Sequence, residues 1–134
     1  MKLESTAAPD LLSPELRRRA QIHAADELTL LLVRDGANEV GIVVLDFTTG
    51  DEDQAILVEI YVRPALRSRG VGHEVLRLAE AFARDRECAW MILDAEPLED
   101  DDDNAKERLI GWYERQGYQV LGAYDHLGKH LNPS

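Results

Sequence analysis

The chain has 134 residues, of which 45% are hydrophobic and 31% charged, a balance typical of a globular protein and unlike that of a disordered one. A net charge of −11 argues against general nucleic-acid binding, which requires a basic surface. No apolar run approaches the roughly 20 residues of a membrane span, and the N-terminal residues lack the apolar core of a secretory signal. We therefore expect a cytoplasmic protein with no membrane partner, folded as one domain over residues 1–134.

The first part of the chain predicts a helix followed by a hairpin. Residues 13–27 are typical of a helix, with Ser13 as the N-cap and Pro14 at the first helical position. We interpret the three arginines at 17–19 as a solvated face of this helix. Residues 28–47 have the pattern of two antiparallel strands around the turn Asp-Gly-Ala-Asn.

The second part alternates strands with helices. Apolar runs typical of buried strands alternate with amphipathic segments typical of helices, in the order strand 55–62, helix 70–86, strand 88–95 and helix 105–117. Gly117 suits the residue just after a helix, and one or two short strands close the chain. The single cysteine, Cys88, is interpreted as a small buried residue. This order predicts a mixed sheet covered by helices, of the α/β class.

The segment between the strand at 55–62 and the helix at 70–86 has the features of an anion-binding turn. Pro64 ends the strand, whereas Gly70 and Gly72 allow a ligand to approach the backbone closely. The first N–H groups of the following helix are unpaired, and the helix dipole adds positive charge there. Arg67 and Arg69 would supply charge-assisted donors. A packing role for the two glycines is the alternative.

Charge along the chain supports the same expectation. Residues 63–86 contain six arginines and three acidic residues, a local balance of +3 in an otherwise acidic chain. Such an island favours a site for a small anion. The nucleotide-binding patterns do not fit, because the chain has no Gly-Lys-Ser/Thr, and Val75 stands where a dinucleotide fingerprint needs a third glycine.

Two motifs in this order resemble the GNAT superfamily of N-acetyltransferases. YVRPALRSRGVGHEVLRLAE resembles the family's acetyl-CoA-binding segment, and WYERQGY at 112–118 resembles its second hallmark. The resemblance covers residues 40–127. It implies a GNAT-like acyl-CoA N-acyltransferase fold: a mixed, mainly antiparallel sheet of six to seven strands with helices on both faces. The fourth and fifth strands of that sheet splay apart to admit the cofactor.

The resemblance implies acetyl-CoA as co-substrate and no metal. It assigns the pantetheine arm to the fourth strand and the pyrophosphate to the turn and the first helical residues. Asn104 resembles the family's asparagine that contacts the arm, although its longer spacing to Tyr113 favours a plain N-cap. The implied cofactor-binding residues are Ile60, Tyr61, Val62, Arg67, Ser68, Arg69, Gly70, Val71, Gly72, His73 and Asn104.

The catalytic residues follow from the same resemblance. The family's tyrosine, which protonates the departing sulfur, corresponds to Tyr113, and a phenol with a pKa near ~10 stays protonated at neutral pH. A purely structural role beside Trp112 is the alternative. Glu59 is the candidate base, but it stands one residue closer to Val62 than the family's glutamate, and one residue reverses the face of a strand. A water chain or Asp94 is also open as the base.

The implied activity is acetyl transfer to a primary amine, on a small cationic molecule or a protein, directly within a ternary complex. A catalytically silent acyl-CoA-binding module is the rival. A toxin-like transferase acting on aminoacylated tRNA is disfavoured by the acidic composition. No metal site is expected. The acidic run at 99–103 does not match the calcium-loop pattern, and the four-residue spacing of His126 and His130 would suit a metal ion only if the segment were a helix. A homodimer is open, since dimers are common in the family.

Overall fold

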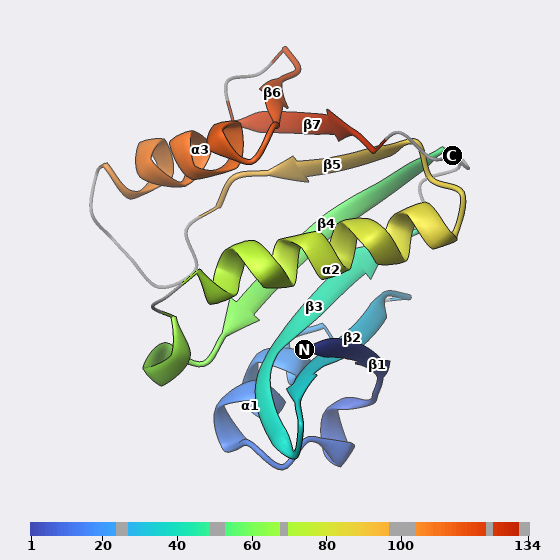
Figure 1. The fold of residues 1–134 in the computed structure, drawn as a ribbon, viewed down its shortest axis with the longest axis vertical. Coiled ribbons are helices and arrows are strands. Elements are labelled where there is room, and N and C mark those ends of the chain that lie inside the picture. Colours follow the sequence, from blue (N-terminus) through green and yellow to red (C-terminus); the bar gives the residue numbers. More distant parts are fainter. Residues whose placement is uncertain (24–26, 49–52, 68–69, 97–103, 123–124, 132–134) are drawn as a thin grey trace.

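The computed structural model describes residues 1–23, 27–48, 53–67, 70–96, 104–122 and 125–131. Within these residues, seven strands form one sheet in the order β1-β2-β3-β4-β5-β7-β6 (Figure 1). Only β4 and β5 are parallel; the other neighbouring strands of the described sheet are antiparallel. The strands are β1 Lys2–Ser5, β2 Thr29–Asp35, β3 Asn38–Asp46, β4 Gln54–Val62, β5 Trp90–Asp94, β6 Gln119–Val120 and β7 His126–His130. The mixed, mainly antiparallel sheet is therefore confirmed.

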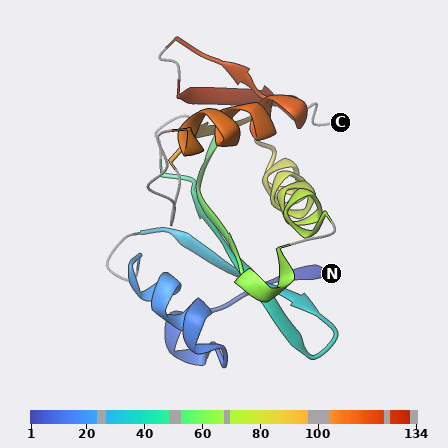
Figure 2. The ribbon, with the colours of Figure 1, turned by 90° about the vertical axis from the view of Figure 1, so that its left-hand side faces the viewer.

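The α-helices of the described residues cover the sheet: α1 Pro14–Gln21, α2 Val71–Asp85 and α3 Ala105–Arg115, with short 3₁₀ turns at Ala8–Asp10 and Pro64–Leu66. Alternate side chains of β2 and β3 enter two different cores, because successive strand residues point to opposite faces. One core contains residues of α2 and α3, and the other contains residues of α1. Figure 2 shows α1 and α2 on opposite sides of these strands. Helices on both faces are thus confirmed.

Local signals account for most element boundaries. The Ser13 hydroxyl accepts a hydrogen bond from the Leu16 N–H at 3.4 Å, as expected of an N-cap. Gly36 in the hairpin and Gly117 after α3 have φ values of +60° and +100°, which favour glycine. The first helix is shorter than predicted and ends at Gln21, because Ile22 and His23 donate to carbonyls three residues back and tighten the last turn.

A β-bulge divides β4. Val44 of β3 pairs with Glu59, whereas Leu45 pairs with Leu57, so Val58 is the extra residue. Before the bulge, Leu57 faces the core that contains α2, and after it Tyr61 faces the core that contains α1. The inserted residue therefore shifts the alternation of faces along the strand and turns Glu59 toward α1.

The two central strands separate, as the family resemblance implies. β4 pairs with β5 only at Gln54, Ala55 and Ile56, opposite Trp90, Met91 and Ile92. Beyond these pairs the strands diverge (Figure 1), and the side of β4 that faces β5 has no strand partner among the described residues. The second half of β4 is therefore an edge on that side within the described part of the chain. None of the described helices is long and apolar enough to cross a bilayer.

Candidate active site

A cleft of about 810 Å³ lies where β4 and β5 diverge. Its walls are the second half of β4, the end of β5 and one face of α3, and they include Ile60, Val62, Leu93, Leu109 and Trp112. A smaller hollow of about 210 Å³ shares several of these lining residues and extends to Gly72 at the start of α2. The cleft thus connects the open edge of β4 to the predicted anion-binding turn. The predicted residues Glu59, Ile60, Tyr61, Val62, Arg67 and Tyr113 all line it.

The two glycines of the turn have different structural roles. Gly70 precedes α2 with φ +76°, a left-handed conformation that favours glycine. Gly72 has no such φ, and a Cβ placed there would approach Trp112 only to 3.7 Å, an ordinary contact. The described parts of the protein therefore do not require glycine at position 72, which weakens the packing explanation. Ser68 and Arg69 lie outside the described residues.

Arg67 is fixed at the end of β4. Its Nε donates a hydrogen bond of 2.8 Å to the Val62 carbonyl, and its guanidinium lies 5.0 Å from the Tyr61 ring centroid. Two arginines farther along the basic island have partners of their own. Arg77 bonds Glu80, and Arg86 lies over the rings of Phe47 and Phe82.

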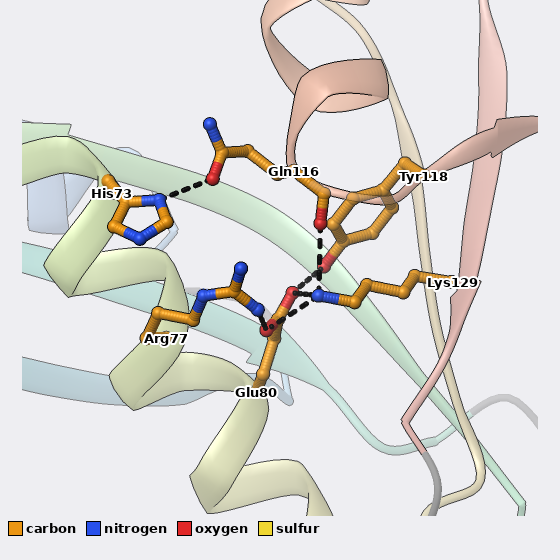
Figure 3. A network of polar contacts seen from close by, with 6 residues as sticks. All are labelled: His73, Arg77, Glu80, Gln116, Tyr118 and Lys129. Carbon is orange, nitrogen blue, oxygen red and sulfur yellow. Dashed lines mark hydrogen bonds and ion pairs between the residues drawn. The ribbon is translucent and has the colours of Figure 1, made fainter.

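Helices α2 and α3 are joined near the turn. The His73 ring hydrogen-bonds the Gln116 side-chain oxygen, which links the first turn of α2 to the end of α3 (Figure 3). Asn104 occupies the position before α3, where its carbonyl accepts from the Arg108 N–H at 3.0 Å. Asn104 is thus the N-cap residue of α3, as expected. Its side chain makes no capping hydrogen bond, because its φ and ψ of −94° and 0° are helical instead of extended.

Tyr113 is buried at the wall of the cleft. Its ring contacts those of Trp112 and Tyr118 edge-on, with centroid distances of 4.9 and 5.4 Å. Burial raises the pKa of the Tyr113 hydroxyl to about 12, since desolvation penalises the phenolate. The side chain is therefore a protonated hydroxyl at neutral pH.

Glu59 is the carboxylate at the other side of the cleft, and its side chain is only 2% exposed. Arg19 donates to both of its oxygens, with Nε–Oε2 and Nη2–Oε1 distances of 2.8 and 3.0 Å. His23 Nε2 lies 2.8 Å from Oε1. The interpretation of 17–19 as a solvated face is therefore wrong for Arg19, which turns inward to a buried carboxylate 40 residues away in the sequence.

The remaining candidates are separated. Asp94 lines the cleft at the end of β5, and its carboxylate bonds His126 Nδ1 at 2.8 Å. His126 and His130 lie on the strand β7, not on a helix. Within the described residues, no three or more His, Cys, Asp and Glu side chains gather as a metal site. The acidic run at 99–103 lies outside them.

A buried charge network that the sequence did not indicate joins α2 to β7. Glu80 of α2 is 0% exposed, and its carboxylate accepts from the Tyr118 hydroxyl at 2.9 Å, from Lys129 Nζ at 3.1 and 3.2 Å, and from Arg77 at 3.1 Å (Figure 3). Lys129 also donates to the Gln116 carbonyl at 3.0 Å. The network fixes the end of α3, the helix that carries Tyr113, against α2.

Comparison with known proteins decides the family. The model described as the Acetyltransferase (GNAT) family matches residues 2–118. The chain belongs to the GNAT acetyltransferase family. No curated protein matches the chain. The resemblance of the two motifs, and with it the acetyltransferase class, is confirmed at the level of the family.

Solved structures show how widely this GNAT fold is shared. The chain is similar to a GNAT family acetyltransferase from Elizabethkingia anophelis with acetyl-CoA bound (13% identity, TM-score 0.67, covering 96% of this chain and 97% of that one). It is also similar to an aminoglycoside 6′-N-acetyltransferase complexed with coenzyme A (15% identity, TM-score 0.70, covering 100% of this chain and 99% of that one). A third similar chain comes from the AtaT–AtaR complex bound to DNA (12% identity, TM-score 0.69, covering 98% of this chain and 95% of that one). At these identities the likeness establishes the GNAT fold.

Proposed function

We propose that this GNAT protein is an acetyl-CoA-dependent N-acetyltransferase that acetylates a primary amine by direct transfer in a ternary complex. One observation carries the proposal: a single cleft, opened by the divergence of β4 and β5, is lined by both Glu59 and Tyr113 and continues to Gly72. The cleft would therefore bring an anion site, a proton donor and a carboxylate to the two co-substrates, acetyl-CoA and the amine. We also propose that residues 1–134 form one domain and that the protein is cytoplasmic.

The cofactor would bind along β4 and at the start of α2. The edge of β4 around Ile60, Tyr61 and Val62 has no strand partner on its β5 side among the described residues, so an extended amide arm could pair with it as an added strand does. The unpaired N–H groups at the beginning of α2, with the helix dipole, suit a pyrophosphate. Its contacts would come from Gly70, Val71, Gly72 and His73, with charge from Arg67. Ser68, Arg69 and Asn104 remain predicted contacts.

The chemistry requires a proton at the sulfur and the loss of a proton from the amine. Tyr113 would donate to the departing thiolate, since its raised pKa keeps the hydroxyl protonated. Glu59 would serve the acceptor side, where it is held by residues of the α1 region. Cys88 is buried away from the cleft and burial raises the pKa of its thiol, which favours direct transfer over an acyl-cysteine intermediate.

The acceptor would be a cationic amine, on a small molecule or a protein. Asp94 and Glu96 line the cleft with exposed carboxylates, and the chain carries a net charge of −11. A negative rim raises the local concentration of cations. One similar structure is an aminoglycoside 6′-N-acetyltransferase, and aminoglycosides are polycationic amines.

The cofactor site is tested by isothermal titration with acetyl-CoA. Gly72→Ala and Gly111→Ala form a matched pair, because each puts alanine into a helix, where it is favoured by up to about 1 kcal/mol over glycine. Gly111 is absent from the cleft lining, and a Cβ there would approach only the flexible Arg115 side chain, at 3.4 Å. We expect both variants to keep or gain thermal stability and only Gly72→Ala to lose acetyl-CoA affinity.

Either of two results would contradict this site. A folded wild-type protein that does not bind acetyl-CoA would overturn the proposed function. Unchanged affinity in Gly72→Ala would show that the cofactor does not approach the start of α2.

Thiol release from acetyl-CoA with a panel of amines then separates a transferase from a silent acyl-CoA-binding module, which would bind the cofactor without turnover. In a transferase, Tyr113→Phe should lower kcat by about 100-fold or more while binding persists.

A further inference from the structure

We infer that His23 is the catalytic base that takes the proton from the acceptor amine, and that Glu59 and Arg19 are positioning residues that hold it. The inference rests on the proposed acetyltransferase function and concerns the acceptor side of the same site, which His23 reaches through its contact with Glu59, a residue of the cleft lining. It starts from the juxtaposition of three side chains from two distant parts of the chain: Arg19 on α1 and His23 just after α1, and Glu59 beyond the bulge of β4.

Glu59 is poorly placed to collect a proton from a substrate by itself. Its side chain is 2% exposed, and both carboxylate oxygens already accept hydrogen bonds. With so little of the side chain exposed, an amine would have to move Arg19 or His23 aside to approach the carboxylate closely. Displacement would leave a buried charge without a partner, which is costly. The carboxylate is therefore better suited to orient a neighbour than to meet the amine.

His23 has the geometry that Glu59 lacks. Its side chain is 16% exposed, so a small molecule can reach part of the ring. Carboxylate oxygens accept hydrogen bonds, so Nε2, at 2.8 Å from Glu59 Oε1, carries the hydrogen and donates it. In the neutral ring the lone pair is then on Nδ1. A carboxylate that fixes the tautomer of an imidazole in this way also stabilises the imidazolium after proton transfer.

The cluster is held rigidly at the cleft. Glu59 lines the cleft because the bulge at Val58 turns it toward α1. The Arg19 guanidinium lies 5.4 Å from the Tyr61 ring centroid, so it contacts both an aromatic ring and the carboxylate. Arg67 lies over the same ring. A catalytic group whose neighbours are locked in this way keeps a productive orientation.

The proton balance is complete with these groups. His23 Nδ1 takes one proton from the ammonium, and the nitrogen lone pair that is released attacks the thioester carbonyl carbon. The carbon–sulfur bond then breaks, and the thiolate takes the hydroxyl proton of Tyr113. The second proton of the attacking nitrogen returns to the tyrosinate as the amide forms. His23 releases its proton to water, which restores the neutral ring.

The test compares His23→Ala with His130→Gln, a control at an exposed histidine on β7, whereas His23 contacts Glu59 of the cleft lining. Thiol release from acetyl-CoA is followed with spermidine, kanamycin and a lysine-containing peptide. We expect His23→Ala to lower kcat by about 100-fold or more and to leave the acetyl-CoA Kd within about 2-fold. Added imidazole should raise the rate of His23→Ala and leave that of Tyr113→Phe unchanged. Circular dichroism verifies the fold of each variant.

The outcomes separate the two levels of the proposal. A wild-type protein that binds acetyl-CoA but releases no thiol with any amine overturns the proposed function. If the wild-type protein turns over and His23→Ala retains more than about a third of its kcat, the role of His23 alone is refuted. A loss of rate that imidazole does not restore, or one that appears only as weaker acetyl-CoA binding, also refutes it. His23→Gln, which keeps a donor to Glu59, should be as slow as His23→Ala.

Discussion

Removing Lys129 should reveal how much the buried network on α2 contributes to stability. Lys129→Met keeps the apolar stem but leaves the fully buried Glu80 carboxylate without its ammonium partner, whose side chain is 17% exposed. Breaking a buried pair from one side typically costs about 3–5 kcal/mol. Arg77, whose side chain is half exposed, and the Tyr118 hydroxyl still contact Glu80. We therefore expect the lower end, about 3 kcal/mol.

Urea unfolding followed by tryptophan fluorescence measures this free energy of unfolding, and the melting temperature should fall by about 10 °C for a chain of this length. Adding Glu80→Gln should recover more than half of the loss, because the amide keeps an acceptor for Tyr118 without the charge. Lys106→Met is the matched control: Lys106 pairs with Glu96 and Asp125 at the surface, so no resolvable change is expected. A loss below about 1 kcal/mol in Lys129→Met, or no recovery in the double variant, would refute the reasoning.

Three further predictions follow from single residues. Gly70→Ala should lower stability by about 1 kcal/mol, measured by urea unfolding, because its φ is +76° although its Cβ would meet nothing; Gly70→Asn, which tolerates this conformation, should lose less. Stability should fall between about pH 10 and 12, because the pKa of Tyr113 is raised to about 12 and that of Tyr118 is raised as well, so the unfolded chain ionises first; equal unfolding free energies at pH 9 and 11 would contradict this. Burial and the raised pKa of Cys88 should make its labelling by a thiol reagent far slower in the native protein than in urea, and comparable rates in both would be unexpected.

The parts of the fold that follow from local rules were predictable. The hairpin turn with Gly36, the amphipathic α2 and the end of α3 at Gly117 each depend on a few neighbouring residues. The diverging strands came from the resemblance of two motifs to a family, since no local pattern specifies where two strands part. β1 was missed because its four residues are mostly polar and pair only at the sheet edge with β2.

The details of the site depend on contacts between distant residues, which a single sequence does not encode locally. Arg19 and His23 meet Glu59 across 40 and 36 positions, and Lys129 meets Glu80 across 49. Within α1, spacing alone makes Arg19 look like any arginine on a helix. The bulge at Val58 inserts one residue without a sequence signal, yet it decides which face Glu59 occupies.

The diverging strands divide the sheet into two parts, β1 to β4 and β5 to β7. Among the described residues these parts pair as strands only from Gln54 to Ile56, with two further backbone hydrogen bonds to the Asp53 carbonyl. A co-substrate that hydrogen-bonds the edge of β4 beyond Ile56 and also contacts α3 would connect these two parts of the sheet, in addition to its role in the reaction. A ligand that binds only the folded state stabilises that state by about 2.7 kcal/mol when its concentration is 100 times its Kd. Such a co-substrate would therefore also stabilise the fold. The resistance of this protein to unfolding and proteolysis would then rise and fall with the supply of its acyl donor.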